Sequence, residues 1–396
     1  MALSSRLRHR FGRAAALAVG ALLVLPGPAT AAVRAEPQPP HPRPAPPGDQ
    51  LDGSGTRVHP LTGAPELPPE LSARSWLVAD VRSGDVLAAH DAHRRLPPAS
   101  TLKSLFALTA MPQLDSTTEH RVRTADLAGM GEGSSLVGVA PDHSYRVADL
   151  WRGVFLSSGN DAVHVLSSMI GGTGSAVRQM QATAKRLGAR DTHVVSPDGY
   201  DMPGQVSSAF DLAIFGRTGL SDPQFARYCS TAHAQFPGDH GDSYGIQNTN
   251  RLLTGAGGVD RYSGAVGVKN GYTTNAGHTL IAAAHRGNRT LLVTLMHPEG
   301  GPTKVYSEAA ALLDWGFAAD GQVRPVGSLL PPHSADPRPS QAPAAAAAVP
   351  ADHSTLFGSR TTLTVAAGVV GALLLAAGIL VSLRRRAAAR GNGHHG

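Results

Sequence analysis

The stretch from Trp76 to Ala89, WLVADVRSGDVLAA, contains two short apolar runs separated by turn-forming residues. Trp76 to Val81 and Val86 to Ala89 flank the segment Ser83-Gly84-Asp85. Apolar runs of this length, rich in valine and interrupted by glycine and aspartate, are typical of a β-hairpin. We therefore predict that a hairpin opens the folded body of this chain.

A second hairpin is predicted at the other end of the body. The apolar runs 279–285 and 290–296 flank the pair Gly287-Asn288, a composition that favours a tight turn. Residues 305–317 then carry apolar side chains at helical spacing, and residues 100–220 are mostly helical in pattern. This order indicates an α/β fold of the α+β type: one antiparallel sheet from both ends of the body, flanked by helices, with a mostly helical inserted subdomain.

The charge of the chain is concentrated at its two ends. The sequence has 35 Lys and Arg against 29 Asp and Glu, a formal charge of +6. Eight of the arginines lie in residues 1–31 and 384–396, so that residues 32–383 carry 27 basic and 29 acidic side chains. Because binding to a phosphate backbone requires a basic surface, we expect no nucleic-acid partner.

The terminal segments have the composition of targeting signals. Residues 1–31 have a basic start, an apolar run and small residues before Ala32, which predicts a secretory signal peptide. Residues 364–383 are uncharged and long enough for a transmembrane helix, and the arginines that follow predict a cytoplasmic tail over 384–396. We therefore expect a single-pass protein of the cell membrane whose folded body is extracellular.

Two further segments are rich in proline. Residues 32–70 contain few large apolar side chains, so we predict that this segment is disordered. Residues 321–362 are predicted to form a proline- and alanine-rich linker between the body and the membrane. The folded domain is accordingly expected to comprise residues 71–320. Since Cys229 is the only cysteine, the domain is stabilised without an intramolecular disulfide.

A serine and a lysine lie one helical turn apart at the start of a predicted helix. Ser100 and Lys103 occur in the sequence PPASTLK, after two prolines and before apolar residues at helical spacing. Both side chains can point into one cleft, where a desolvated lysine could lose its proton and act as the base for a serine nucleophile. Alone, this pair would equally fit a helix-capping serine and a surface lysine.

Two other short segments carry suitable chemistry. Ser158-Gly159-Asn160 forms a predicted turn after an apolar run, and Lys269-Asn270-Gly271-Tyr272-Thr273 falls on a predicted strand over 265–274. Each segment taken singly fits an ordinary turn or a glycine-rich strand edge. Only four lysines occur in the chain, and two of them, Lys103 and Lys269, belong to these segments.

Together these segments resemble the penicillin-recognising serine hydrolases, and among them the low-molecular-mass D-alanyl-D-alanine carboxypeptidases. The resemblance extends over the body, through PPASTLK, FLSSGNDAV, the loop GARDTHVVSPDGY, NTNRLL, VGVKNGYTTNAG and LLDWGF. It implies a β-lactamase/transpeptidase-like fold and a serine peptidase that removes the last D-alanine from peptidoglycan stem peptides. β-Lactams would be covalent inhibitors, and no cofactor is implied.

The resemblance also implies a role for each site residue. Ser100 would be the acylated nucleophile, Lys103 its general base, and Ser158 the group that passes a proton to the leaving amine. Asn160 would orient Lys103 and the substrate amide, with Lys269 as the cationic partner. The N–H groups of Ser100 and Tyr272 would form the oxyanion hole. Lys269 and Thr273 would bind the carboxylate of the substrate, and Asn270 and Gly271 would be further substrate-binding residues.

The chain departs from the family pattern at two positions. Asn270 stands where a threonine or serine is usual, and Lys304 stands near the place of a frequent arginine. Two alternatives to the carboxypeptidase are a class A-like β-lactamase and a weakly active wall-binding module. A lactamase of that class needs a glutamate to activate water, and none occurs between Asn160 and Lys269. The module is suggested by Asn270 alone.

A metal enzyme is the remaining alternative. The 18 histidines show no H-E-x-x-H spacing, and their densest groups, 90–93 and 239–242, fall in predicted loops. We therefore predict no metal site. Lys185 is expected to lie on a solvated helix face.

Overall fold

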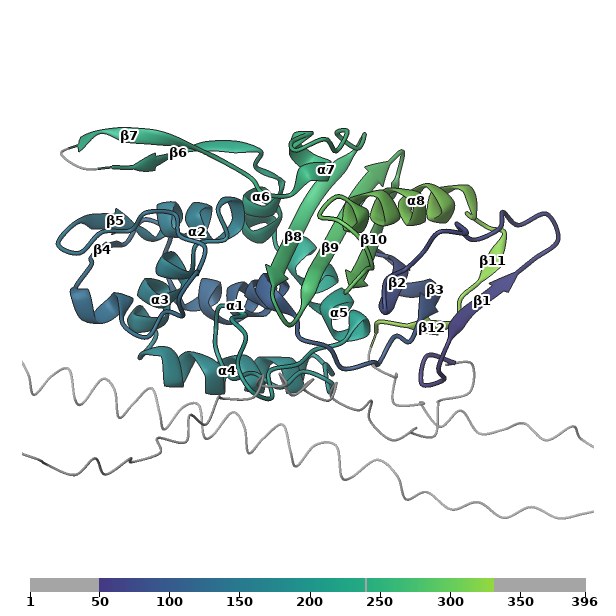
Figure 1. Cartoon of the computed structure of the whole chain (residues 1–396), viewed down its shortest axis with the longest axis horizontal. Coiled ribbons are helices and arrows are strands. Elements are labelled where there is room, and N and C mark those ends of the chain that lie inside the picture. Colours follow the sequence, from purple (N-terminus) through teal and green to yellow (C-terminus); the bar gives the residue numbers. More distant parts are fainter. Residues whose placement is uncertain (1–49, 239–240, 331–396) are drawn as a thin grey trace, which may run out of the picture. The chain divides into compact units, whose positions relative to one another are not determined.

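The computed structural model describes residues 50–238 and 241–330. Eight strands of these residues form one sheet in the order β11-β1-β3-β2-β10-β9-β8, with β12 paired to β3, and all pairs are antiparallel. The strands are β1 (Thr56–Pro60), β2 (Ser75–Asp80), β3 (Asp85–His90), β8 (Ala265–Thr273), β9 (Gly277–Arg286), β10 (Arg289–Met296), β11 (Val323–Arg324) and β12 (Gly327–Ser328). The β2–β3 and β9–β10 hairpins meet where β2 pairs with β10, which confirms the predicted sheet from both ends of the body (Figure 1).

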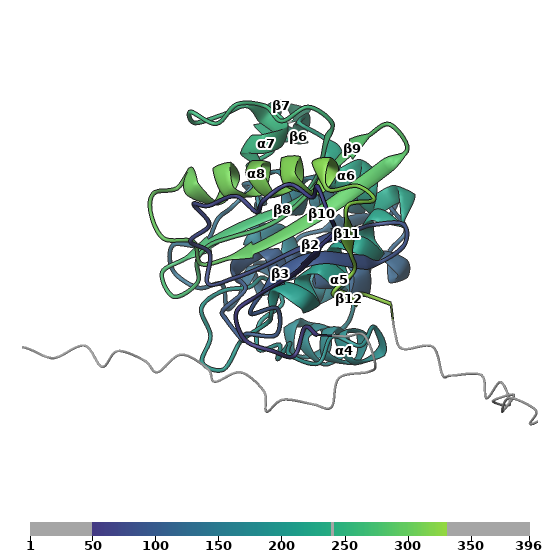
Figure 2. The ribbon, with the colours of Figure 1, turned by 90° about the vertical axis from the view of Figure 1, so that its right-hand side faces the viewer.

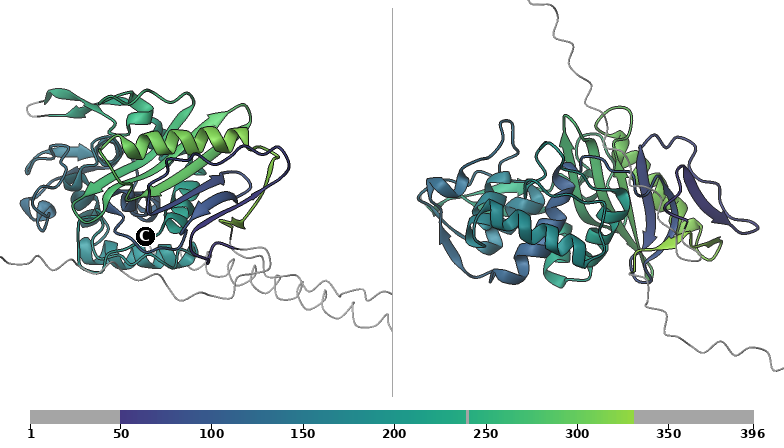
Figure 3. Two further views of the ribbon diagram at one scale, coloured as in Figure 1. Left: turned by 45° about the vertical axis from the view of Figure 1, so that its right-hand side comes forward. Right: turned by 90° about the horizontal axis from the view of Figure 1, so that it is seen from below.

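The segment between β3 and β8 is mostly helical, as predicted. Its helices are η1 (Ala99–Leu102), α1 (Lys103–Ala110), η2 (Met111–Gln113), η3 (Thr124–Leu127), α2 (Val147–Leu156), α3 (Asn160–Met169), α4 (Thr173–Arg186), α5 (Ala209–Leu220), α6 (Pro223–Ser230) and α7 (Arg251–Thr254). Two small antiparallel pairs interrupt them, β4 (Glu119–Arg121) with β5 (Ser144–Arg146), and β6 (His233–Pro237) with β7 (Ser243–Gln247). Figure 3 shows α2, α3 and α4 lying to one side of the large sheet.

Both faces of the sheet are covered by helices. Successive side chains along each strand point to opposite faces, so neighbouring residues of one strand belong to different clusters. Leu280 and Ala282 of β9 pack in the cluster that contains Leu312 of the last helix, α8 (Lys304–Ala318). Ile281 and Ala283 pack in the other cluster, with residues of α1 and α5. Figure 2 shows α8 on one face of the sheet and α5 on the opposite face. Strand β8, which carries Lys269, is therefore the edge of a sheet that has helices on both faces.

The structure corrects the predicted boundaries of the body. The segment 32–70 was predicted to be disordered, but β1 pairs with β3 and β11, and Leu51 is buried. Residues 321–330, predicted as linker, contribute β11 and β12. A sheet edge has unpaired backbone groups that an extended strand satisfies without large apolar side chains of its own, so composition alone missed these strands. The described part of the body spans residues 50–330.

The predicted signal peptide, transmembrane helix and tail lie outside the described residues. Within residues 50–238 and 241–330, no helix is both long and apolar enough to span a bilayer.

Candidate active site

Ser100 lies on the short helix η1, in a turn fixed by hydrogen bonds to one carbonyl. The hydroxyls of Thr101 and Thr279 donate to the Pro98 oxygen at 2.5 and 2.9 Å. Ala99 has a left-handed backbone with φ of 49°, which is uncommon for a residue with a side chain. The turn is thus held from both η1 and β9, and it presents Ser100 beside strand β8.

Lys103, the first residue of α1, reaches back to the serine. Its Nζ donates to Ser100 Oγ at 2.6 Å and to the Asp198 carbonyl oxygen at 2.8 Å, and lies 3.4 Å from Ser158 Oγ. The lysine is only 1 % exposed. Burial lowers its pKa to about 8, although the charges of Asp198 and Asp161 oppose the shift. The structure therefore places a lysine of lowered proton affinity against the hydroxyl predicted to be the nucleophile.

Ser158 lies between the two lysines. It follows α2 with a left-handed backbone, φ 57°, and its side chain is almost fully buried. Lys269 Nζ donates to Ser158 Oγ at 3.0 Å and to the carbonyl oxygen of its own neighbour Asn270 at 2.9 Å. The hydroxyl of Ser158 therefore connects Lys103 to Lys269, as required of a group that relays a proton.

The two buried lysines differ in the charges that surround them. Burial lowers the pKa of Lys269 well below its usual value, and the nearby charge of Lys103 lowers it further. Lys103 has Asp198 and Asp161 near it, whereas no carboxylate opposes the shift at Lys269. The carboxylates therefore lie near Lys103 rather than Lys269, and the predicted roles of Lys103 as base and Lys269 as cation stay predictions.

Asn160 begins α3, where its backbone N–H donates to the Ser135 oxygen and its side-chain amide donates to Ser134 Oγ. The predicted contact with Lys103 is not among the hydrogen bonds of the described residues. The Asn160 Oδ1 atom is buried and has no hydrogen-bond partner there. A buried oxygen without a donor is costly, so this atom is available to accept an N–H from a ligand.

Gly271 allows β8 to approach the serine closely. A Cβ atom at this position would lie 2.7 Å from the backbone nitrogen of Ser100 and 2.9 Å from Ala99 Cβ. Only glycine fits without displacing the strand or the turn. This places Gly271 of β8 against the amide of Ser100. The Tyr272 ring is 63 % exposed and lies against His278 with centroids 4.6 Å apart.

The two predicted carboxylate ligands have protein partners. Lys269 donates to Ser158, as described, and the Thr273 hydroxyl donates to Asp201 Oδ1 at 2.7 Å. Asn270 is on the other face of β8, where its Oδ1 accepts a hydrogen bond from Thr249 Oγ1 at 3.0 Å. That face borders a cavity of about 480 Å³ lined by Thr249, Arg251, Asn270, Gly271, Tyr272, His278 and Tyr306, among others.

Sequence reasoning missed three residues that shape the site around Ser100 and Lys103. Asp198 is buried; although burial opposes its ionised form, the hydrogen bond from His164 and the charge of Lys103 lower its pKa to about 2. Asp161 accepts hydrogen bonds from the backbone of residues 137–139 and so fixes the loop beside Ser158. Arg251 extends over the Tyr306 ring, 5.6 Å from its centroid. The residues 248–253 and the SPDGY loop were noted only for their resemblance, because no spacing in the sequence connects them to Lys103.

The other lysines and the cysteine lie away from the groove. Lys304 donates to the Glu70 carbonyl oxygen at 3.0 Å and lies 3.7 Å from Glu308, so it does not replace an arginine in the site. Lys185 is exposed on α4, as predicted. Cys229 is buried, and burial raises the pKa of its thiol to about 12, which fits a packing role.

Comparisons with known proteins agree with the geometry. A family model described as D-alanyl-D-alanine carboxypeptidase matches residues 62–299. The chain is 42% identical over 266 residues to D-alanyl-D-alanine carboxypeptidase DacB2 of Mycobacterium tuberculosis, covering 66% of this chain and 87% of that protein. It is 34% identical to D-alanyl-D-alanine carboxypeptidase DacD of Escherichia coli K12, covering 63% of this chain and 64% of the relative's length.

Solved structures show the same similarity. The crystal structure of a D-alanyl-D-alanine carboxypeptidase from Mycobacterium tuberculosis H37Rv superposes with a TM-score of 0.62 at 41% identity, covering 69% of this chain and all of that one. Penicillin binding protein 6B from Escherichia coli gives a TM-score of 0.58 at 31% identity, covering 66% of this chain and 81% of that protein.

Proposed function

The chain belongs to the D-alanyl-D-alanine carboxypeptidase family of serine peptidases, and we propose that it removes the terminal D-alanine from peptidoglycan stem peptides through an acyl-enzyme on Ser100. One observation carries the assignment of the nucleophile: the buried Lys103 Nζ lies 2.6 Å from Ser100 Oγ. A serine is a weak nucleophile unless a base removes its proton, and Lys103 is the base within reach.

Acylation begins with the neutral form of Lys103, which is about a tenth of the molecules at pH 7 for a pKa of about 8. Lys103 takes the proton of Ser100 Oγ while that oxygen bonds to the carbonyl carbon of the penultimate residue. The N–H groups of Ser100 and Tyr272 stabilise the oxyanion, and the close approach at Gly271 supports this pairing.

The leaving D-alanine receives its proton through Ser158. Lys103 returns the proton to the Ser158 hydroxyl, which gives its own proton to the departing amine as the C–N bond breaks. The distances of 3.4 and 3.0 Å from Ser158 Oγ to the two lysines support such a relay. Water then attacks the ester with Lys103 again as base, and Ser100 recovers its proton.

The terminal carboxylate of the substrate is proposed to bind in the cavity behind Asn270. The Thr249 hydroxyl donates to the side-chain oxygen of Asn270, so the N–H groups of the Asn270 amide can donate to a different acceptor. Arg251 lines the same cavity, and after burial its charge is the cause that lowers the pKa of His278. A guanidinium and an amide are both suited to a carboxylate, so Asn270 serves here without a hydroxyl.

β-Lactams are expected to acylate Ser100 and to be released slowly. The class A-like lactamase is the weaker proposal, since the segment between Asn160 and Lys269 has no glutamate to activate water. The test is release of D-alanine from a soluble peptide ending in Lys-D-Ala-D-Ala, with Ser100→Ala as the control. Equal release by both proteins would refute the assignment, and rapid turnover of a fluorescent penicillin would favour the lactamase.

We also propose that the catalytic body lies outside the cell. Residues 1–31 would direct its export and be cleaved off, and the apolar segment 364–383 would anchor it in the membrane. The support is sequence composition. Cell fractionation of the full chain and of a chain ending at residue 360 tests it: only the full chain should sediment with membranes. Membrane association of both chains would contradict this anchor.

A further inference from the structure

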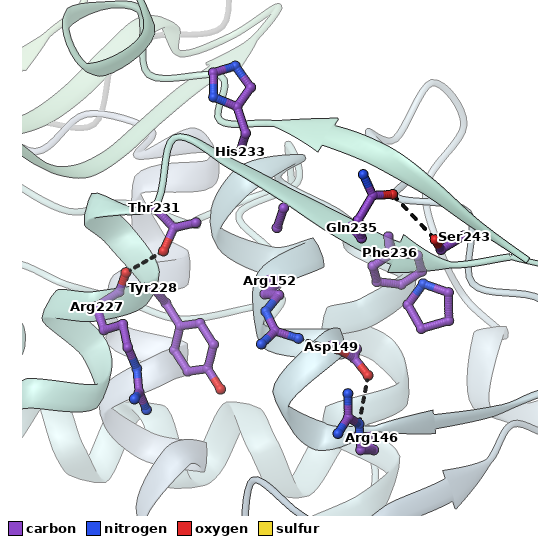
Figure 4. A pocket seen from close by; sticks show the side chains of 12 residues that line it. Arg146, Asp149, Arg152, Arg227, Tyr228, Thr231, His233, Gln235, Phe236 and Ser243 are labelled. Atoms are coloured by element: carbon purple, nitrogen blue, oxygen red, sulfur yellow. Dashed lines mark hydrogen bonds and ion pairs between the residues drawn. The ribbon is translucent and has the colours of Figure 1, made fainter.

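A second cavity, of about 550 Å³, lies between α2, α6 and the β6–β7 pair (Figure 4). Three arginines line it: Arg146, the last residue of β5, Arg152 of α2 and Arg227 of α6. We call it the arginine pocket. The carboxypeptidase mechanism assigns no role to any of these side chains.

The arginine pocket has a local positive charge. Among the described residues, Asp149 is the only carboxylate that lines it, and it pairs with Arg152 and, at 3.2 Å, with Arg146. Three guanidinium groups against one carboxylate leave an excess of two positive charges. Residues 50–330 as a whole carry 23 Lys and Arg against 25 Asp and Glu, so this concentration is not a property of the body as a whole.

Arg227 is available to a ligand. It is exposed on α6, and within the described residues no ion pair or side-chain hydrogen bond is formed by its guanidinium. Asp149, in contrast, is only 5 % exposed and is occupied by the other two arginines. The pocket therefore holds the unpaired guanidinium of Arg227 beside two guanidinium groups that share one carboxylate. Guanidinium groups bind carboxylates in a bidentate manner.

Strand β6 forms one side of the pocket. All five of its residues, His233 to Pro237, line the cavity, and it pairs on one side with β7 in a sheet that has only these two strands among the described residues. Its other edge can accept an extended peptide by adding a strand. Tyr228 and Phe236 supply apolar surface beside this edge.

We propose that the arginine pocket is a second, non-catalytic binding site for an extended acidic peptide. This peptide is a stem of the same peptidoglycan, next to the stem that is cleaved at Ser100. This identity of the peptide rests on the proposed function. The substrate is a polymer with many stems, so a second contact on one molecule raises the effective concentration of the next stem at Ser100. A stem with two free carboxylates matches the two excess positive charges.

The first experiment measures binding to protein whose Ser100 is already acylated. The full chain is acylated at Ser100 with benzylpenicillin and titrated with diacetyl-L-Ala-γ-D-Glu-L-Lys-D-Ala, which has two carboxylates and no cation, by calorimetry or NMR. We expect binding that weakens about tenfold in Arg227→Ala and is unchanged in Arg178→Ala, which removes an exposed arginine of α4. Arg227 is chosen because removing Arg152 would take one of its two partners from the buried Asp149.

The outcomes separate the ligand classes. No binding of the peptide, or equal binding of the peptide with both carboxylates amidated, overturns the proposal. Arg227-dependent binding of inorganic phosphate without binding of the peptide overturns it in favour of a phosphate ligand.

The second experiment measures D-alanine release. We expect Arg227→Ala to release D-alanine from isolated cell-wall sacculi at least threefold more slowly than wild type, while its rate on the soluble peptide is unchanged. Equal rates of Arg227→Ala and wild type on sacculi would overturn the proposed second binding site but not the proposed function. No release from the soluble peptide by wild type would instead refute the proposed function, and the binding titration would still report on the pocket.

Discussion

The most informative perturbation is the charge environment of Lys103. Only neutral Lys103 accepts the Ser100 proton, and its neutral fraction rises with pH, so the acylation rate must rise with pH. For a pKa of about 8, the neutral fraction grows about fifty-fold between pH 6 and pH 8 and then levels off. A lysine with its usual pKa of 10.5 would gain about tenfold per pH unit up to about pH 9.5.

Asp198→Asn tests the cause of this profile. The Asp198 carboxylate raises the pKa of Lys103 against the effect of burial, so its removal lowers that pKa and moves the plateau to lower pH. The Asp198 carbonyl oxygen that accepts from Lys103 at 2.8 Å remains in the variant. Below the plateau, each unit of decrease in the pKa raises the acylation rate about tenfold.

The assay is single-turnover acylation by a fluorescent penicillin from pH 5.5 to 9.5, with Asp142→Asn as the control. Asp142 is 81 % exposed and pairs with Arg121, so its removal changes the net charge equally without altering the groove. A wild-type rate that still increases tenfold per unit at pH 9.5 refutes a lowered pKa of the base. An unchanged midpoint in Asp198→Asn refutes the electrostatic coupling to Lys103.

Three further predictions concern the groove and the core. Gly271→Ala places a methyl group 2.7 Å from the Ser100 nitrogen, so we expect penicillin acylation to slow at least about hundredfold; a near-normal rate would show that β8 need not approach the serine. Arg251→Ala should raise KM about tenfold for a substrate with a terminal carboxylate but not for its amide, at equal kcat; equal effects on both would exclude a carboxylate contact. Burial and the charge of Asp191 raise the pKa of Asp211 to about 7, so the folded state prefers the protonated acid and loses stability as pH rises from about 4 through 7. Asp211→Asn should therefore stabilise the protein more at pH 8 than at pH 5 in urea unfolding, and the opposite order would contradict the raised pKa.

The sheet and the helical insert could be predicted because their signals are local. The hairpins around Gly84 and Gly287 combine apolar strands with turn residues, and both form as expected. β1, β11 and β12 could not be predicted, since short polar or proline-flanked strands are stabilised by pairing at a sheet edge rather than by their own side chains. Composition therefore placed both ends of the body too far inward.

The same distinction holds for the site. The sequence by itself determined the three segments that carry chemistry, because Ser100 with Lys103, Ser158 with Asn160, and Lys269 with Gly271 are each set by spacing along the chain. Only the tertiary structure decided how their charges are arranged. Asp198 lies 95 residues from Lys103 in the chain yet accepts its hydrogen bond, and Arg251 reaches the cavity behind Asn270 from α7. A pKa depends on burial and on neighbours in space, and a sequence specifies neither until the chain has folded.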